Sequence, residues 1–157
     1  MKKTIKVIIV LVFAFSTSLS AQISFDLNFF KKPKAAINFG YHSGGGGWAG
    51  FDLEYLPHKR IGVQGGVGIL SYGLGLNYHL NKGGVRSSFI QLSYWHQGFG
   101  ERHTQSLLGP TFVYRFKRFV QLQGGIGARV GTGPSFDTEI SSPLAIMYSV
   151  SLYLPVK

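Results

Sequence analysis

Four residues that lie close together in this 157-residue chain carry side chains suited to hydrolysis or metal binding. His96, Glu101 and His103 lie around one expected loop, with Ser106 nearby. Histidine, carboxylate and serine are the groups of a nucleophilic triad, in which each member must be held by the next. A glycine-containing loop does not provide such support, and the spacing matches no zinc pattern. We therefore expect a solvated surface loop with no catalytic residue and no metal; an enzyme that works through these residues is the alternative.

Two glycine-rich runs, at 43–47 and 124–127, suggest phosphate-binding loops. Neither has the spacing of a dinucleotide or P-loop motif followed by a helix. We interpret Gly47 and its neighbours as a flexible hairpin loop, and the later glycines as space for bulky groups such as Trp95. The sequence therefore predicts no cofactor.

The elements that must position these residues are strands. Apolar and polar residues alternate with period two from residue 35 onwards, and helical periodicity is not apparent. Turn-forming residues divide this part of the chain into eight segments. The expected strands are 35–42, 48–56, 61–70, 72–80, 88–97, 107–116, 119–130 and 144–154.

The two faces of these strands differ in kind. One face is apolar and uncharged in all eight, as at Leu74 and Val150, and the other is small or polar, as at Gln121 and Ser149. A soluble sandwich or lipocalin-like barrel, the alternative, would show water a face rich in Lys and Glu. Charged residues make up only 14% of the chain, against about 25% in soluble domains. The pattern predicts a transmembrane β-barrel with its apolar face outside.

An even number of strands is typical of bacterial membrane barrels, and closure of the sheet leaves no exposed edge in lipid. The sequence therefore predicts an eight-stranded antiparallel up-and-down barrel over 35–157. Pro110 cannot donate to a sheet ladder, so we expect it at the outer end of its strand, where pairing ends. The expected periplasmic turns are 57–60, 81–87 and 117–118, and the expected outer loops are 43–47, Ser71, 98–106 and 131–143.

The first 21 residues have the form of a cleaved secretory signal peptide: a basic start, an apolar run over 7–15 and a small polar stretch. The apolar run is shorter than the roughly 20 residues of a spanning helix, although an uncleaved anchor is the alternative. Residues 22–34 form a periplasmic N-terminal segment that could be an edge strand, an amphipathic tail or a lumen plug. The chain has no Cys, which excludes a disulfide framework and the lipid-bearing Cys of a lipoprotein.

Positive charge gathers at the expected periplasmic end. Removal of the signal peptide takes away three lysines and lowers the net charge from +10 to +7. The remaining cations at this end suit anionic phospholipid heads, although turns also carry charge for solubility alone. Nucleic acid is not an expected partner of an exported protein. The predicted basic rim consists of Lys59, Arg60, Lys82, Arg86, Lys117 and Arg118, with Lys31, Lys32, Lys34 and Lys157 nearby.

Charged residues with the polar parity form an expected lumen polar cluster with a structural role: Asp52, Glu54, Arg115 and Arg129. The second and sixth strands of an eight-stranded barrel stand opposite each other, and its lumen is just wide enough for side chains to fill. Glu54 and Arg115 come at similar depths, so the sequence predicts an ion pair between them. Separate solvation by lumen water is the alternative.

These features resemble the small outer-membrane β-barrel family of Gram-negative bacteria, of the OmpX- and OmpA-barrel type. The resemblance covers 35–154 and rests on the alternating strands, the signal peptide and glycine-rich hairpins such as 120–131. It implies a monomer in outer-membrane lipid, inserted by the outer-membrane assembly machinery. The chain departs from the family at its end, where Tyr153 is followed by Leu-Pro-Val-Lys instead of a terminal aromatic residue. The His-x-Ser motif of outer-membrane lipid A deacylases is missing, since His42 is followed directly by Ser43.

A lumen filled by its own side chains leaves no space for a wide pore. We expect a structural or surface-interaction barrel. The runner-up is a small outer-membrane enzyme that acts on lipid or envelope substrates, followed by a narrow ligand carrier. A lumen packed by Trp48, Trp95 and the arginines would exclude the carrier.

Overall fold

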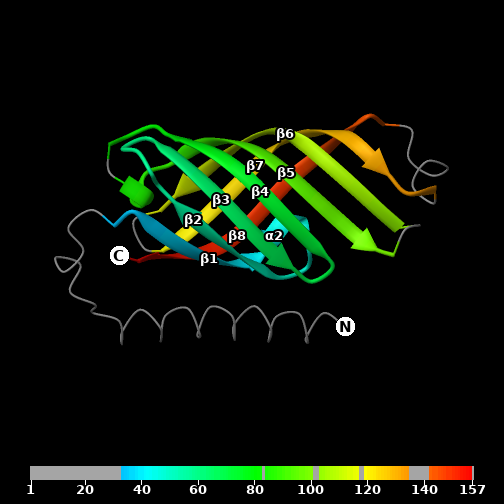
Figure 1. Ribbon diagram of the computed structural model, residues 1–157, viewed down its shortest axis with the longest axis horizontal. Helices are drawn as coiled ribbons and strands as arrows, with labels where there is room; N and C mark the ends of the chain where they lie inside the picture. Colours follow the sequence, from blue (N-terminus) through cyan, green and yellow to red (C-terminus); the bar gives the residue numbers. More distant parts are fainter. Residues whose placement is uncertain (1–32, 83, 101–102, 117–118, 135–141, 157) are drawn as a thin grey trace, which may run out of the picture. The chain divides into compact units, whose positions relative to one another are not determined.

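The chain forms a closed antiparallel β-barrel in the computed structural model, which describes residues 33–82, 84–100, 103–116, 119–134 and 142–156. The strands follow one another around the wall in chain order, and the first pairs with the last (Figure 1). They are β1 (Ala35–Tyr41), β2 (Gly50–Tyr55), β3 (Ile61–Gly68), β4 (Ser71–His79), β5 (Phe89–Phe99), β6 (His103–Arg115), β7 (Val120–Thr132) and β8 (Leu144–Val156). The predicted all-β, eight-stranded fold is confirmed.

Two short helical turns accompany the strands: α2 (Ser43–Gly46) between β1 and β2, and η2 (Gly84–Arg86) between β4 and β5. Within the part of the chain that the structure describes, no helix has both the length and the apolar character to cross a membrane.

The period-two alternation separates the inside of the barrel from its outer wall as predicted. Leu74 is 61% exposed on the outer wall, while Gln121 is 1% exposed in the lumen. Val150 and Ser149 divide in the same way. Each strand of the wall therefore turns a row of apolar side chains outward, although a few others, such as Phe89 and Met147, face the lumen.

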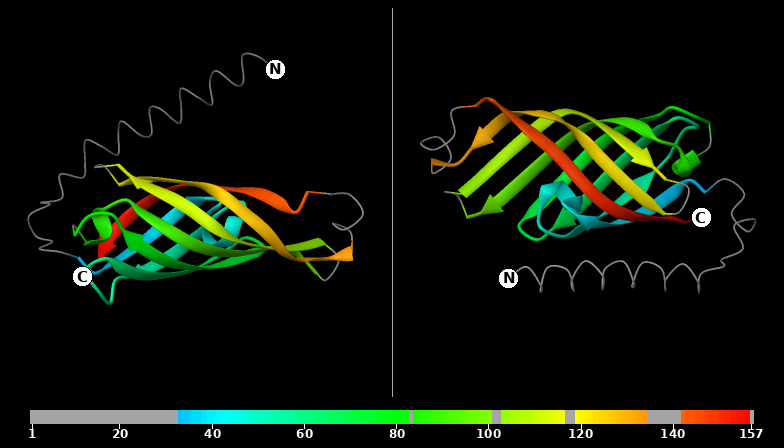
Figure 2. Two further views of the ribbon diagram at one scale, coloured as in Figure 1. Left: turned by 90° about the horizontal axis from the view of Figure 1, so that it is seen from above. Right: turned by 180° about the vertical axis from the view of Figure 1, so that it is seen from behind.

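The barrel has two unlike ends. The start of β1 and the end of β8 lie together at one end, here called the termini end, with the β2–β3, β4–β5 and β6–β7 connections (Figure 1). The opposite end is called the loop end. Strands β5 to β8 have 11 to 13 residues, against 6 to 9 in β1 to β4. The wall therefore extends further at the loop end on the side of β5 to β8 (Figure 2).

Several expected strand limits are wrong. Ser71 is the first residue of β4 and not a connection, since it pairs with both Gly68 and Gln97. The β3–β4 hairpin turns at Ile69 and Leu70, where Leu70 has φ 59°. Two-residue hairpins favour Gly, Asn or Asp at such positions, so an Ile-Leu turn has no sequence signal.

The expected outer loop at 98–106 is largely strand. Gly98 pairs with Thr104 and Phe99 with His103, so β5 continues to Phe99 and β6 begins at His103. Pro110 lies in the interior of β6 opposite Leu92, and not at the strand's outer end as predicted. The β6–β7 pairs occur on both sides of Gly109 and Pro110 but not at them, which accommodates the missing N–H of proline.

Candidate functional site

An ion pair crosses the lumen near the termini end. Arg115 Nη1 on β6 lies 2.7 Å from Glu54 Oε2 on β2, and neither side chain has exposed area. The same nitrogen donates a hydrogen bond to the Val85 carbonyl oxygen. The pair predicted from opposite strands and equal depth is present in the structure.

The other carboxylate oxygen of Glu54 accepts two hydrogen bonds. Asn77 Nδ2 donates to Oε1 at 2.6 Å, and His79 Nε2 lies 3.0 Å from the same oxygen. The opposite ring nitrogen of His79 lies 2.8 Å from Ser87 Oγ, which donates to the Gly84 carbonyl. This Ser–His–Glu series resembles a catalytic triad in its connections, but His79 and Glu54 are fully buried. The series links the β4–β5 connection to the ion pair.

The guanidinium of Arg115 makes further hydrogen bonds and contacts two aromatic rings. Its Nε donates to Gln121 Oε1 at 2.8 Å, and its Nη2 lies 3.4 Å from Asn38 Oδ1. The guanidinium lies between the rings of Phe89 and Tyr153, at 4.8 and 4.7 Å from their centroids. Planar contact with aromatic faces and several directed bonds suit arginine and not lysine.

The glycine-rich run after β1 folds into the barrel and does not form the expected exposed loop. Asp52 Oδ2 accepts a hydrogen bond from Gly44 N at 3.1 Å, and Ser71 Oγ donates to the Gly44 carbonyl at 2.7 Å. Gly44 and Gly45 have φ of 68° and 89°, and a Cβ on Gly45 would lie 2.0 Å from the Tyr72 carbonyl oxygen. Only glycine fits this position. Because the run at 43–47 is held inside the barrel by these contacts, we call it the plug.

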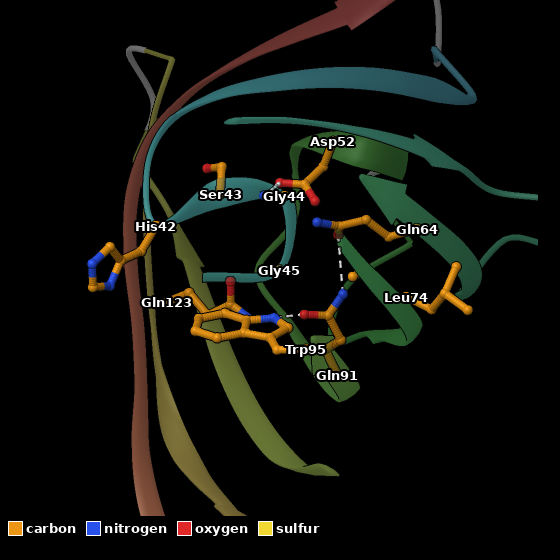
Figure 3. A pocket seen from close by; sticks show the side chains of 11 residues that line it. His42, Ser43, Gly44, Gly45, Asp52, Gln64, Leu74, Gln91, Trp95 and Gln123 are labelled. Carbon is orange, nitrogen blue, oxygen red and sulfur yellow. Dashed lines mark hydrogen bonds between the residues drawn. The ribbon is translucent and has the colours of Figure 1, made fainter. Parts of the chain in front are cut away.

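The rest of the lumen is filled by amide, hydroxyl and apolar groups. Gln91 receives a hydrogen bond from Gln123 at 2.8 Å and donates one to Gln64 at 3.1 Å (Figure 3). Trp95 packs with Leu107 and Met147. The pocket drawn in Figure 3 beneath the plug has a volume of only about 10 Å³, roughly the space of one water.

Glycines on the lumen side make room for these groups, although none of the glycines at 124–127 has Trp95 among its nearest contacts, contrary to the prediction for that run. A Cβ on Gly66 would lie 2.0 Å from Asp52 Oδ1, and a Cβ on Gly75 would lie 1.9 Å from Gln91 Nε2. A Cβ on Gly46 would lie 2.6 Å from the Trp95 ring. Trp48, in contrast, is 74% exposed, so it is not one of the residues that pack the lumen.

The four charged residues of the expected lumen cluster do not form one group. Glu54 and Arg115 pair, while Asp52 bonds the plug. Arg129 lies eight residues along β7 from Gln121, about 26 Å at the usual rise per residue. It donates to Gln105 Oε1 at 3.4 Å and to the Ser142 carbonyl, and so belongs to the loop end.

Two of the four residues suited to hydrolysis come together. His96 on β5 and Ser106 on β6 are cross-strand partners, with Nδ1 and Oγ 2.9 Å apart. They share the parity of the outer wall, where Tyr94 OH donates to Ser106 Oγ at 3.2 Å and Tyr72 stacks on the His96 ring at 4.8 Å. His103 pairs with Phe99 nearer the hairpin tip, and Glu101 lies outside the described residues.

The described part of the predicted basic rim lies at the termini end. Lys59 and Arg60 are in the β2–β3 connection, and Lys82 and Arg86 are in the β4–β5 connection. Arg60 Nη1 donates to Tyr78 OH at 3.0 Å. Lys117 and Arg118 lie outside the described residues, as do residues 1–32 with the expected signal peptide and most of the N-terminal segment.

Some lumen residues were missed because they break the polar pattern. Phe89 and Met147 are fully buried inside the barrel, and Leu107 is 2% exposed there. Their inward position follows from strand parity, so parity alone could have predicted it. Ser87 and Val85 come from a connection and carried no periodic signal at all.

Among the residues that the structure describes, no three His, Asp or Glu side chains group as metal ligands. In comparisons with known proteins, the chain matches no family model, no curated protein and no solved structure.

Proposed function

We propose that this chain is a transmembrane β-barrel of a bacterial outer membrane with a structural or surface-interaction role and without a wide pore. The observation that carries the proposal is the outer wall, where every strand exposes large apolar side chains while most polar side chains of the strands face the lumen. A soluble monomer rarely exposes a contiguous apolar patch of more than a few hundred Å². Lipid acyl chains can surround such a wall, and a closed sheet has no unpaired strand edge to expose to them.

Aromatic side chains support this location. Tyr72 and Tyr94 lie close together toward the loop end, with centroids 6.3 Å apart. Tyr114 and Phe116 lie together toward the termini end, at 4.7 Å. Such rings are typical of the two membrane interfaces. The plug and the packed lumen support a role other than diffusion of solutes.

Insertion by the outer-membrane assembly machinery is part of the proposal. Tyr153 faces the lumen, and its hydroxyl donates to the Phe116 carbonyl. The outward positions near the end of β8 are Leu152 and Leu154.

The test is fractionation of cells that express the full chain, followed by surface proteolysis of intact cells. The proposal expects outer-membrane recovery, cleavage only at loop-end sites, and different gel migration of boiled and unheated samples. A folded, monodisperse protein in buffer without detergent would refute it.

A second candidate, hydrolysis of acyl esters in envelope lipids, is favoured by the His96–Ser106 hydrogen bond on the outer wall. In this reaction Ser106 Oγ attacks the ester carbonyl while His96 takes its proton, and the alcohol leaves with the proton that His96 returns. Water then gives a proton to His96 and hydrolyses the acyl-serine to the free acid, and His96 returns that proton to Ser106 Oγ. Ser106→Ala and His96→Ala should each abolish turnover of a micellar acyl ester, while His103→Ala in the same hairpin should not. Absence of turnover in the unaltered protein, or its retention in Ser106→Ala, would contradict this candidate.

A further inference from the structure

A groove at the termini end combines an apolar wall with a cationic side. It has a volume of about 870 Å³, within the usual range of ligand sites. Its apolar wall consists of Tyr114, Phe116 and Leu122, which are 40 to 47% exposed. Its polar side consists of Arg86, Ser87 and Ser88 from the β4–β5 connection. These residues define the rim groove.

Arg86 brings a charge to the rim groove that nothing in the described structure neutralises. The ion pairs of the described residues join Glu54 to His79 and Arg115. Asp52, the other described carboxylate, bonds the plug. Arg86 Nη2 is shielded from solvent and has no hydrogen-bond partner within the described chain. A shielded guanidinium nitrogen without an acceptor is costly, and phosphate is a preferred partner of this group.

We infer that the rim groove binds one anionic phospholipid, with its phosphate at Arg86 and an acyl chain along Tyr114 and Leu122. This inference rests on the proposed membrane location. The order of the groups fits an amphiphile, since the cationic side lies at the rim and the apolar wall runs from it up the barrel. Charge complementarity selects a lipid with net negative charge over a zwitterionic one. Among the described residues that line the groove, the pair of Arg115 with Glu54 leaves Arg86 as the cation without a carboxylate partner.

The test compares lipid retention by the purified full-length mature barrel in non-ionic detergent, using native mass spectrometry. The probes are phosphatidylglycerol and phosphatidylcholine with the same acyl chains. One phosphatidylglycerol should be retained about tenfold more tightly than phosphatidylcholine, and Arg86→Gln should remove this difference. Arg60→Gln is the matched control, because Arg60 lies at the same end outside the groove and is bonded to Tyr78.

A second variant, Val120→Trp, fills the groove without changing charge and should displace the lipid. Glycerol phosphate, which lacks acyl chains, should not compete, whereas competition would assign the site to free phosphate. Equal retention of the two lipids, or equal loss in Arg86→Gln and Arg60→Gln, would overturn the inference. Different gel migration of boiled and unheated samples and insertion into vesicles are measured in parallel. If these hold while lipid selectivity fails, the inference fails alone and the proposed membrane location stands.

Discussion

The Glu54–Arg115 pair should couple two opposite walls of the barrel energetically. Glu54→Gln keeps an oxygen acceptor for Asn77 and His79 but removes the charge that faces Arg115. Arg115→Met keeps a long side chain between Phe89 and Tyr153 but leaves the carboxylate without its cation. Each substitution therefore leaves one buried charge without its counterion.

The separation of 2.7 Å sets the scale of the effect. At an effective dielectric constant of about 20, two unit charges at this distance attract by about 6 kcal/mol. Desolvation of both groups offsets a large part of this attraction. We therefore expect each single variant to lose about 3–5 kcal/mol of unfolding free energy, and the double variant to recover a coupling energy of about 2–4 kcal/mol.

The assay is reversible urea unfolding in detergent micelles of the unaltered protein, both single variants and the double variant. Asp52→Asn combined with Arg115→Met is the matched control, because Asp52 is a lumen carboxylate that bonds Gly44 and not an arginine. The control pair should be additive within about 0.5 kcal/mol. Additivity in the Glu54–Arg115 cycle as well would refute the reasoning, and would mean that lumen water solvates each charge separately.

Three further outcomes follow from the described positions. Gly45→Ala should cost about 2–4 kcal/mol of unfolding free energy and expose the plug to protease, because it combines a positive φ with a backbone clash; Gly124→Ala, with nothing within 4 Å, should change stability by less than about 0.5 kcal/mol. Leu74→Arg should cost about 2–4 kcal/mol in a bilayer if this outward position lies at mid-depth, and no loss would contradict the assigned faces. Trp95→Phe should remove the tryptophan emission that iodide cannot quench, while Trp48→Phe should leave it, since Trp95 is 6% exposed and Trp48 is 74% exposed.

Inward or outward position was predictable because it depends only on strand parity. Gln121 and Ser149 are inside and Leu74 and Val150 are outside, as the alternation required. One irregularity lies beyond this rule. Ser106 pairs with Gly131 and Leu107 with Arg129, so Val130 is left without a partner on β6. A bulge of this kind depends on two strands together and has no signal in either one.

Loops were less predictable than strands, because their conformation depends on distant partners. The run at 43–47 has the composition of an exposed loop, yet the Asp52 carboxylate and the Ser71 hydroxyl hold it inside the barrel. The hairpin turn at Ile69 and Leu70 has apolar residues, so composition could not indicate it.

The sequence by itself determined the strand number, the two faces and the opposition of Glu54 and Arg115, because period two and chain order are enough to specify a simple closed barrel. Only the tertiary structure decided which other groups meet this pair. His79 and Ser87 reach it from one side and Gln121 from another. These contacts depend on how far each strand is staggered against the next and on where a connection folds back. Both are set by packing across the lumen, between residues far apart in the chain.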